Sequence, residues 1–117
     1  MTENTDYTTR TFAFSCDVVR FYMALIGVRN FPFGIARQVL RSGTSIGANL
    51  EEARVPTTPR DVKAKFRIAL KEARETKYWI RLIRATNLAP SVSSDRLLQE
   101  CDELVAILTV SVRNMKG

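Results

Sequence analysis

The chain has 117 residues, enough for one domain with a single modest hydrophobic core. Hydrophobic residues make up 45% of the sequence and charged residues 26%, a balance typical of a globular protein rather than a disordered one. Histidine is absent, which excludes histidine-based catalytic triads and the Glu-x-x-His ligand pairs of di-iron bundles. The net charge of +6 favours a polyanionic partner wherever the basic residues cluster.

The composition also bears on where the protein works. No run of about 18 apolar residues occurs, and the polar first ten residues contain no hydrophobic signal segment, so we predict no membrane contact. The two cysteines, Cys16 and Cys101, are far apart in sequence, and each falls on an apolar helical stripe. Such spacing favours free thiols in a reducing compartment over a disulfide, so we expect a cytoplasmic protein.

The first predicted helix runs from about residue 8 to Ile26, after a polar start (1–8) that we expect to be loosely ordered. Its apolar residues form two nearly opposite faces, one with Phe12, Cys16, Val19, Met23 and Ile26, the other with Phe14, Val18, Phe21, Leu25 and Val28. A helix that is apolar on two faces favours an oligomer, although close wrapping by its own bundle is an alternative. We assign the subunit interface to Phe14, Val18, Phe21 and Leu25.

The second predicted helix runs from about Gly34 to Arg54 and carries two glycines beside its apolar stripe. Gly43 and Gly47 are four residues apart and therefore lie on one face of the helix. A glycine weakens a helix by about 1 kcal/mol relative to alanine. We therefore predict that a neighbouring helix backbone approaches closely at this face.

A polar seam follows the other flank of the same stripe and includes one residue of the next helix: Arg41, Ser45, Asn49, Glu52 and Glu72. Glu72 projects from the apolar arc of that next helix, where a carboxylate is costly unless it is paired. We predict that Arg41 or Asn49 reaches it. The seam contains no base activated by a neighbour, so we interpret it as a network that fixes helix register or a subunit interface, and no catalytic residue is predicted.

The third and fourth helices complete the predicted fold. Val55–Pro59 ends the second helix, and Thr58 is the expected N-cap of a third that extends to about Thr86. Ser94 is the expected cap of a fourth helix that ends near Gly117. Four amphipathic helices with short connections predict a single all-α domain (1–117), an antiparallel up-down four-helix bundle.

Basic residues follow one sector of the third helix and form what we call the basic stripe: Arg60, Lys63, Arg67, Lys71, Arg74 and Arg81. At 1.5 Å per residue the stripe is roughly 31 Å long. One sign of charge along a helix face favours contact with the phosphates of nucleic acid. The alternatives are a basic solvated face, or a surface that pairs with acidic residues of a neighbouring subunit. Because the members are all basic, we predict phosphate contacts without base stacking.

The second and third helices resemble those of a known bacterial family. The motif residues are Phe31-Pro32, Leu40-Arg41, Ser45-Ile46, Asn49-Leu50, Glu52, Phe66, Ala69, Glu72, Ala73 and Glu75. With these residues the chain resembles the four helix bundle proteins encoded in intervening sequences of ribosomal RNA genes, also labelled S23 ribosomal protein-like. The chain departs from the family where a Leu-x-x-Trp-like signature is replaced by the segment 7–14.

The resemblance implies a ring-like homopentamer with no established enzymatic activity. The chain is also similar to the accessory protein of diversity-generating retroelements, which partners a reverse transcriptase and RNA. We therefore predict a small, basic, non-enzymatic oligomer that binds RNA or DNA non-specifically through the basic stripe, without a cofactor, metal or small-molecule substrate. The alternative is a structural or protein-interaction scaffold, such as an accessory subunit of a reverse transcriptase, with no direct nucleic-acid contact.

Overall fold

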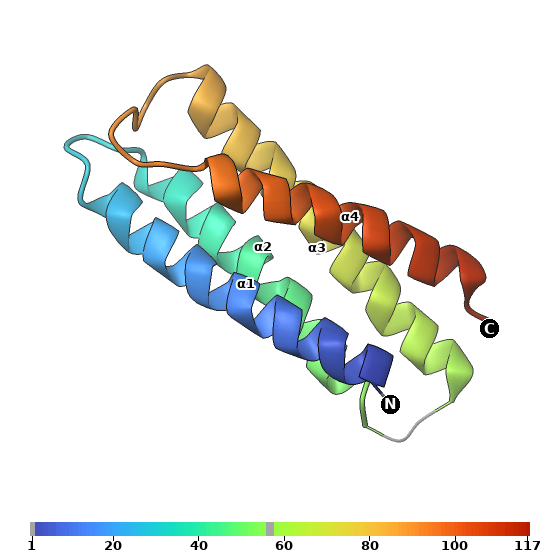
Figure 1. Ribbon diagram of the computed structural model, residues 1–117. Coiled ribbons are helices and arrows are strands. Elements are labelled where there is room, and N and C mark those ends of the chain that lie inside the picture. Colours follow the sequence, from blue (N-terminus) through green and yellow to red (C-terminus); the bar gives the residue numbers. More distant parts are fainter. Residues whose placement is uncertain (1, 56–57) are drawn as a thin grey trace.

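A computed structural model describes residues 2–55 and 58–117, and these form four helices and no strand (Figure 1). The helices are α1 (Thr2–Ile26), α2 (Phe33–Glu52), α3 (Pro59–Ala85) and α4 (Asp95–Asn114). They run alternately up and down in an elongated body of 47 × 22 × 20 Å (Figure 1). The predicted all-α four-helix bundle is confirmed.

The helices do not contact one another equally. α2 packs along both α1 and α3, and α3 also packs along α4, whereas α1 and α4 make few contacts with each other. The core contains fully buried side chains from all four helices, including Phe14, Val39, Ile80 and Leu104. The bundle therefore has three closed sides and one open side, between α1 and α4.

The helix ends agree with the predicted caps in part. The Thr58 side chain accepts a hydrogen bond from the backbone N–H of Asp61 at 3.1 Å, which confirms the predicted N-cap of α3. Ser94 precedes α4 as predicted, but its hydroxyl lies 3.0 Å from Nη1 of Arg84 and does not cap the helix. The predicted break at 55–59 includes Pro56 and Thr57, which lie outside the described residues.

The start of α1 differs from the prediction. We expected a loosely ordered segment up to residue 8, whereas the helix begins at Thr2. The Tyr7 ring packs edge-on against Phe66 with centroids 6.0 Å apart, and its hydroxyl lies 2.8 Å from the Ser111 hydroxyl. Thr8 is buried as well. These contacts make Tyr7 and Thr8 part of the bundle, which the sequence pattern alone did not predict.

The two apolar faces of α1 are both present, but the face to which we assigned a subunit interface lies in the core of the bundle. The face with Phe14, Val18, Phe21 and Leu25 is buried in the bundle's own core, with side chains at most 6% exposed. The opposite face is the one left open, with Phe12 64% and Met23 59% exposed. Periodicity alone could not decide between the faces, because both are equally apolar and only the docking of α2 buries one of them.

The two glycines of α2 lie at close contacts with α1. A Cβ atom on Gly47 would lie 3.1 Å from the backbone oxygen of Thr11, as expected for two helix backbones in close approach. A Cβ atom on Gly43 would lie 2.7 Å from both methyl groups of Val18, so here the neighbour is a side chain. The predicted close approach is confirmed, with backbone contact at Gly47.

Cys16 lies on α1 and Cys101 on α4. Both cysteines are free; Cys16 is half-buried, and Cys101 is buried with its Sγ 3.3 Å from the Ala73 carbonyl oxygen. Burial raises the pKa of the Cys101 thiol to about 12, so this thiol stays protonated. None of the helices in the described ranges is long and apolar enough to cross a membrane.

Candidate nucleic-acid interface

α3 carries the charge excess of the whole protein. Its 27 residues include nine lysines and arginines and three carboxylates, an excess of six that equals the net charge of the chain. Charge is therefore concentrated on one element rather than spread over the surface. A concentrated field of one sign attracts polyanions more strongly than the same charge distributed evenly.

Three of the α3 cations are neutralised by neighbouring helices. Lys65 pairs with Glu52 of α2 at 2.6 Å. On the other side of α3, Lys77 pairs with Asp102 at 2.8 Å and Arg84 with Asp95 at 2.5 Å. None of the three belongs to the basic stripe, so the carboxylates of the bundle neutralise the flanks of α3.

The basic stripe divides into two parts. At its N-terminal end, Nζ of Lys63 donates to the carbonyl oxygens of Met115 at 3.2 Å and Gly117 at 3.5 Å, and the Arg60 backbone lies against Gly117. The remaining four side chains are exposed, and none forms an ion pair with any residue in the described part of the chain: Arg67, Lys71, Arg74 and Arg81. We call these four the open stripe.

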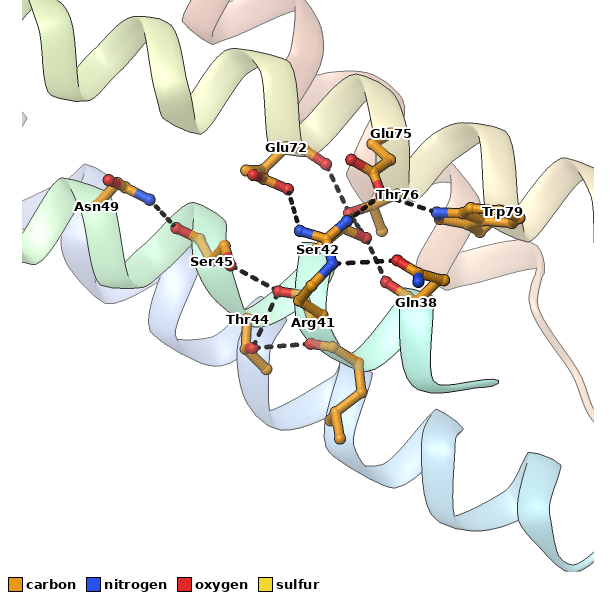
Figure 2. A network of polar contacts seen from close by, with 11 residues as sticks. Gln38, Arg41, Ser42, Thr44, Ser45, Asn49, Glu72, Glu75, Thr76 and Trp79 are labelled. Carbon is orange, nitrogen blue, oxygen red and sulfur yellow. Dashed lines mark hydrogen bonds and ion pairs between the residues drawn. The ribbon is translucent and has the colours of Figure 1, made fainter. Parts of the chain in front are cut away.

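The open stripe points away from the bundle. At 100° per residue its centre lies nearly opposite Ala69 and Thr76, which are fully buried. Glu72 and Glu75 lie on the side of α3 that faces α2, where both bind Arg41 (Figure 2). Lys71 lies one turn from Glu75 and helps to lower the pKa of that carboxyl, but it forms no ion pair with it. The open stripe thus combines exposure and uniform charge with side chains that form no ion pair in the described part of the chain.

One aromatic side chain on this face was missed by the sequence analysis. Tyr78 lies in the seven-residue gap between Arg74 and Arg81, on the same helix face, and is 55% exposed. The helix face that carries the stripe therefore includes an exposed aromatic ring beside its basic members. The i+4 spacing from Arg74 and i−3 spacing from Arg81 would have identified Tyr78.

The polar seam holds α2 against α3, with Arg41 at its centre (Figure 2). Nη1 of Arg41 lies 3.2 Å from Oε1 of Glu72, and Nη2 binds the Glu75 carboxylate. Glu72 is nearly buried, with its side chain 12% exposed, so this partner offsets the cost of removing its charge from water. Of the two partners predicted for Glu72, Arg41 is confirmed.

The other members of the predicted seam take different partners. The Asn49 amide donates to the carbonyl oxygen of Ser45 at 2.8 Å, not to Glu72, and the Ser45 hydroxyl donates to the carbonyl oxygen of Arg41 (Figure 2). Glu52 lies at the end of α2 and pairs with Lys65. Asn49 and Ser45 thus bind backbone carbonyls of α2 and reach Glu72 only indirectly, through Arg41, whereas Glu52 pairs with a different residue of α3.

Four further residues that the predicted seam did not include take part in the observed network: Ser42, Glu75, Thr76 and Trp79. The hydroxyls of Ser42 and Thr76 lie 2.8 Å apart in the buried α2–α3 contact. Glu75 also accepts a hydrogen bond from the indole Nε1–H of Trp79 at 3.0 Å. That bond, followed by the Arg41 guanidinium, lowers the pKa of the Glu75 carboxyl. Every polar group here is engaged by another, as expected for a structural network rather than a catalytic one.

The surface outside α3 contains a large groove. An open groove of about 810 Å³ lies between α1 and α4, with Phe14, Phe21 and Leu97 among its lining residues. Three or more potential metal-ligating side chains do not gather anywhere in the described residues. In contrast to the open stripe, the groove has balanced charges, because its charged lining residues are three arginines and three carboxylates: Arg10, Arg20, Arg96, Asp17, Glu100 and Glu103.

Fold and surface together define a class of protein: a small basic four-helix bundle with an unneutralised cationic face. Residues 3–110 match the 23S rRNA-intervening sequence protein family, and the chain belongs to it. The chain is similar to the crystal structure of a Bacteroides thetaiotaomicron protein of unknown function from the S23 ribosomal protein family. It has 32% sequence identity and a TM-score of 0.81, and the match covers 92% of this chain and 99% of that one.

No curated protein matches the sequence. Neither the family nor the Bacteroides protein is described as an enzyme.

Proposed function

We propose that the protein binds nucleic acid through phosphate contacts made by the open stripe. The observation that carries this proposal is the contrast within α3: the cations on its flanks are paired, whereas Arg67, Lys71, Arg74 and Arg81 are exposed and form no ion pair within the described chain. From Arg67 to Arg81 the helix rises by 14 residue steps, or roughly 21 Å, which is long enough to contact several successive phosphates.

The test is the salt dependence of binding. Each phosphate contact releases condensed counterions, so log affinity should fall with log salt by about 0.7 to 0.9 per contact. Changing Arg67, Lys71 and Arg74 together to glutamine should flatten that slope by about two to three units. Fluorescence anisotropy with labelled oligonucleotides over a series of salt concentrations measures both quantities.

A charge-matched control separates the stripe from net charge. Arg29, Arg54 and Arg113 are exposed on other elements, and changing all three to glutamine removes the same charge. The control should retain most of the slope. Equal losses in both triple variants would mean that only net charge matters, and absence of binding at low salt would favour the protein-interaction scaffold.

We propose in addition that the chain self-associates, through the exposed rather than the buried face of α1. Its exposed apolar side chains are Phe12, Val19, Met23 and Ile26, each 41–64% exposed. Contiguous exposed apolar surface on a small protein is typical of a protein contact. This proposal also accommodates the scaffold alternative, because the same face suits a protein partner.

Light scattering tests self-association. The wild type should have a mass several times 13.2 kDa, and Phe12→Glu with Met23→Glu should reduce it while leaving the helical circular dichroism unchanged. A monomeric wild type at micromolar concentration would contradict the proposal. If instead the Arg67, Lys71 and Arg74 triple variant dissociated, the open stripe would be a subunit contact and the nucleic-acid proposal would lose its support.

A further inference from the structure

We propose that Tyr78 is a base-stacking residue within the open stripe, and that the ligand class is therefore single-stranded nucleic acid. The inference rests on the proposed function and adds to it the form of nucleic acid that is bound. It follows from the position of the ring, from the way the ring is held and from the chemistry of its neighbours.

The position places an exposed aromatic ring among phosphate-binding cations. Tyr78 is 55% exposed and follows Arg74 by four residues and precedes Arg81 by three. Residues at these spacings are surface neighbours, about 5–6 Å apart at Cβ. A strand whose phosphates contact the two arginines would therefore carry a base past the ring.

Trp79 contacts the Tyr78 ring and leaves at least one face of that ring uncovered. Tyr78 and Trp79 form an edge contact, with centroids 5.1 Å apart and planes at 73°. An edge contact covers at most one face of the tyrosine ring, so the other is left free by Trp79. Such a face is the surface on which a base stacks.

The polar seam fixes Trp79 in turn. Its indole Nε1–H donates to Glu75 at 3.0 Å, and Glu75 also binds Arg41 of α2 (Figure 2). The chain of contacts from Arg41 through Glu75 and Trp79 reaches the ring of Tyr78. The network that joins α2 to α3 thus also orients Trp79, which in turn contacts the proposed stacking residue, Tyr78.

Stacking selects single strands for a physical reason. In a duplex each base is already stacked and paired inside the helix, so a side chain on a helix surface meets only phosphates and groove edges. In a single strand the π-face of a base is free, and stacking tolerates any base. Stacking on a base does not distinguish ribose from deoxyribose. The proposed ligand is therefore a flexible single strand of either DNA or RNA.

The experiment compares three labelled probes by fluorescence anisotropy at one low salt concentration: oligothymidylate, oligouridylate and a duplex, each about 12 nucleotides or base pairs long. Tyr78→Ala should weaken binding of both single strands by about 5- to 150-fold, and Tyr78→Phe should retain it. Duplex binding should change less than about twofold, because phosphate contacts are intact. The ratio of the two single-strand affinities identifies DNA or RNA as the preferred source.

A control aromatic residue lies elsewhere on the surface. Phe33 is 56% exposed and also lies beside an arginine, with Arg37 5.8 Å from its ring centroid, but it is on α2. Phe33→Ala should leave all three affinities unchanged. The slope of log affinity against log salt should be the same in Tyr78→Ala as in the wild type, because no cation is removed.

The outcomes separate this inference from the proposed function. Unchanged single-strand affinity in Tyr78→Ala, with a salt slope still dependent on Arg67, Lys71 and Arg74, would overturn stacking and leave phosphate binding in place. Equal losses on single strands and duplex would also overturn stacking. No binding of any probe by the wild type would overturn both.

Discussion

Two arginines bridge pairs of helices in this bundle, and each binds two glutamates, yet they work in different surroundings. Arg41 joins α2 to α3 through Glu72 and Glu75, and Arg10 joins α1 to α4 through Glu100 and Glu103. The α2–α3 pair lies on a continuous packed contact, whereas Arg10 lines the open groove.

The carboxylates differ in exposure accordingly. The Glu72 side chain is 12% exposed, whereas Glu75, at 30%, is about as exposed as Glu100 at 31%, and Glu103 is 50% exposed. The arginines do not follow this order, because the Arg10 side chain is 37% exposed and that of Arg41 is 47% exposed. The two networks therefore differ chiefly in the nearly buried Glu72, whose ion pair is the one that water screens least.

The largest effect should come from added volume on the packed side. Gly47→Leu should lower the free energy of unfolding by about 3 kcal/mol or more, because its side chain would push apart α1 and α2 at the Thr11 backbone. Ala13→Leu is the matched variant, since Ala13 is exposed and lines the groove; it should change stability by about 0.5 kcal/mol or less. Urea denaturation measures both. Similar losses would show that the groove is as closely packed as the rest.

Removal of Arg41 should have the next largest effect. Arg41→Met leaves the nearly buried Glu72 without its ion-pair partner and should cost about 1–3 kcal/mol. A double variant with Glu72→Met removes the unpaired charge and should recover part of that loss. If the double variant lost more unfolding free energy than the two single variants lose together, Glu72 would have another partner.

A smaller effect should appear as the pH is lowered. The folded pKa of Glu75 lies below its ordinary value of 4.5, first because of the Trp79 indole and then because of Arg41. A lowered folded pKa contributes stability above the unfolded pKa, and this stability is lost as the pH falls through the folded value. Glu75→Gln should therefore flatten the decline in unfolding free energy between about pH 5 and pH 3. If the unfolding free energy of Glu75→Gln fell with pH as steeply as that of the wild type, the ionised Glu75 carboxylate would not stabilise the α2–α3 contact.

The smallest effect is expected at the open side. Arg10→Met removes three hydrogen bonds, to Glu100 and Glu103, yet should cost only about 0.2–1 kcal/mol because the partners are solvated. The loss should shrink further in high salt. A loss as large as that of Arg41→Met would contradict the comparison and make Arg10 an anchor of equal weight.

Much of this arrangement was predictable from the sequence. The 3.6-residue periodicity predicted four helices and a bundle, and Thr58 before Pro59 marked the start of α3. The Arg41–Glu72 pair was predictable because a carboxylate within an apolar arc needs a partner, and the adjacent polar flank offered few candidates. The basic stripe was evident because all its members share one helix sector.

Only the tertiary structure decided which surfaces are free. Both faces of α1 are apolar, and the packing of α2 buries Phe14 and exposes Phe12. Similarly, the α3 cations look alike in sequence, but the carboxylates of α2 and α4 neutralise Lys65, Lys77 and Arg84 and leave the open stripe without a partner in the described chain. Periodicity fixes the face of a helix on which a residue lies, whereas burial and pairing depend on what the neighbouring helices bring to that face.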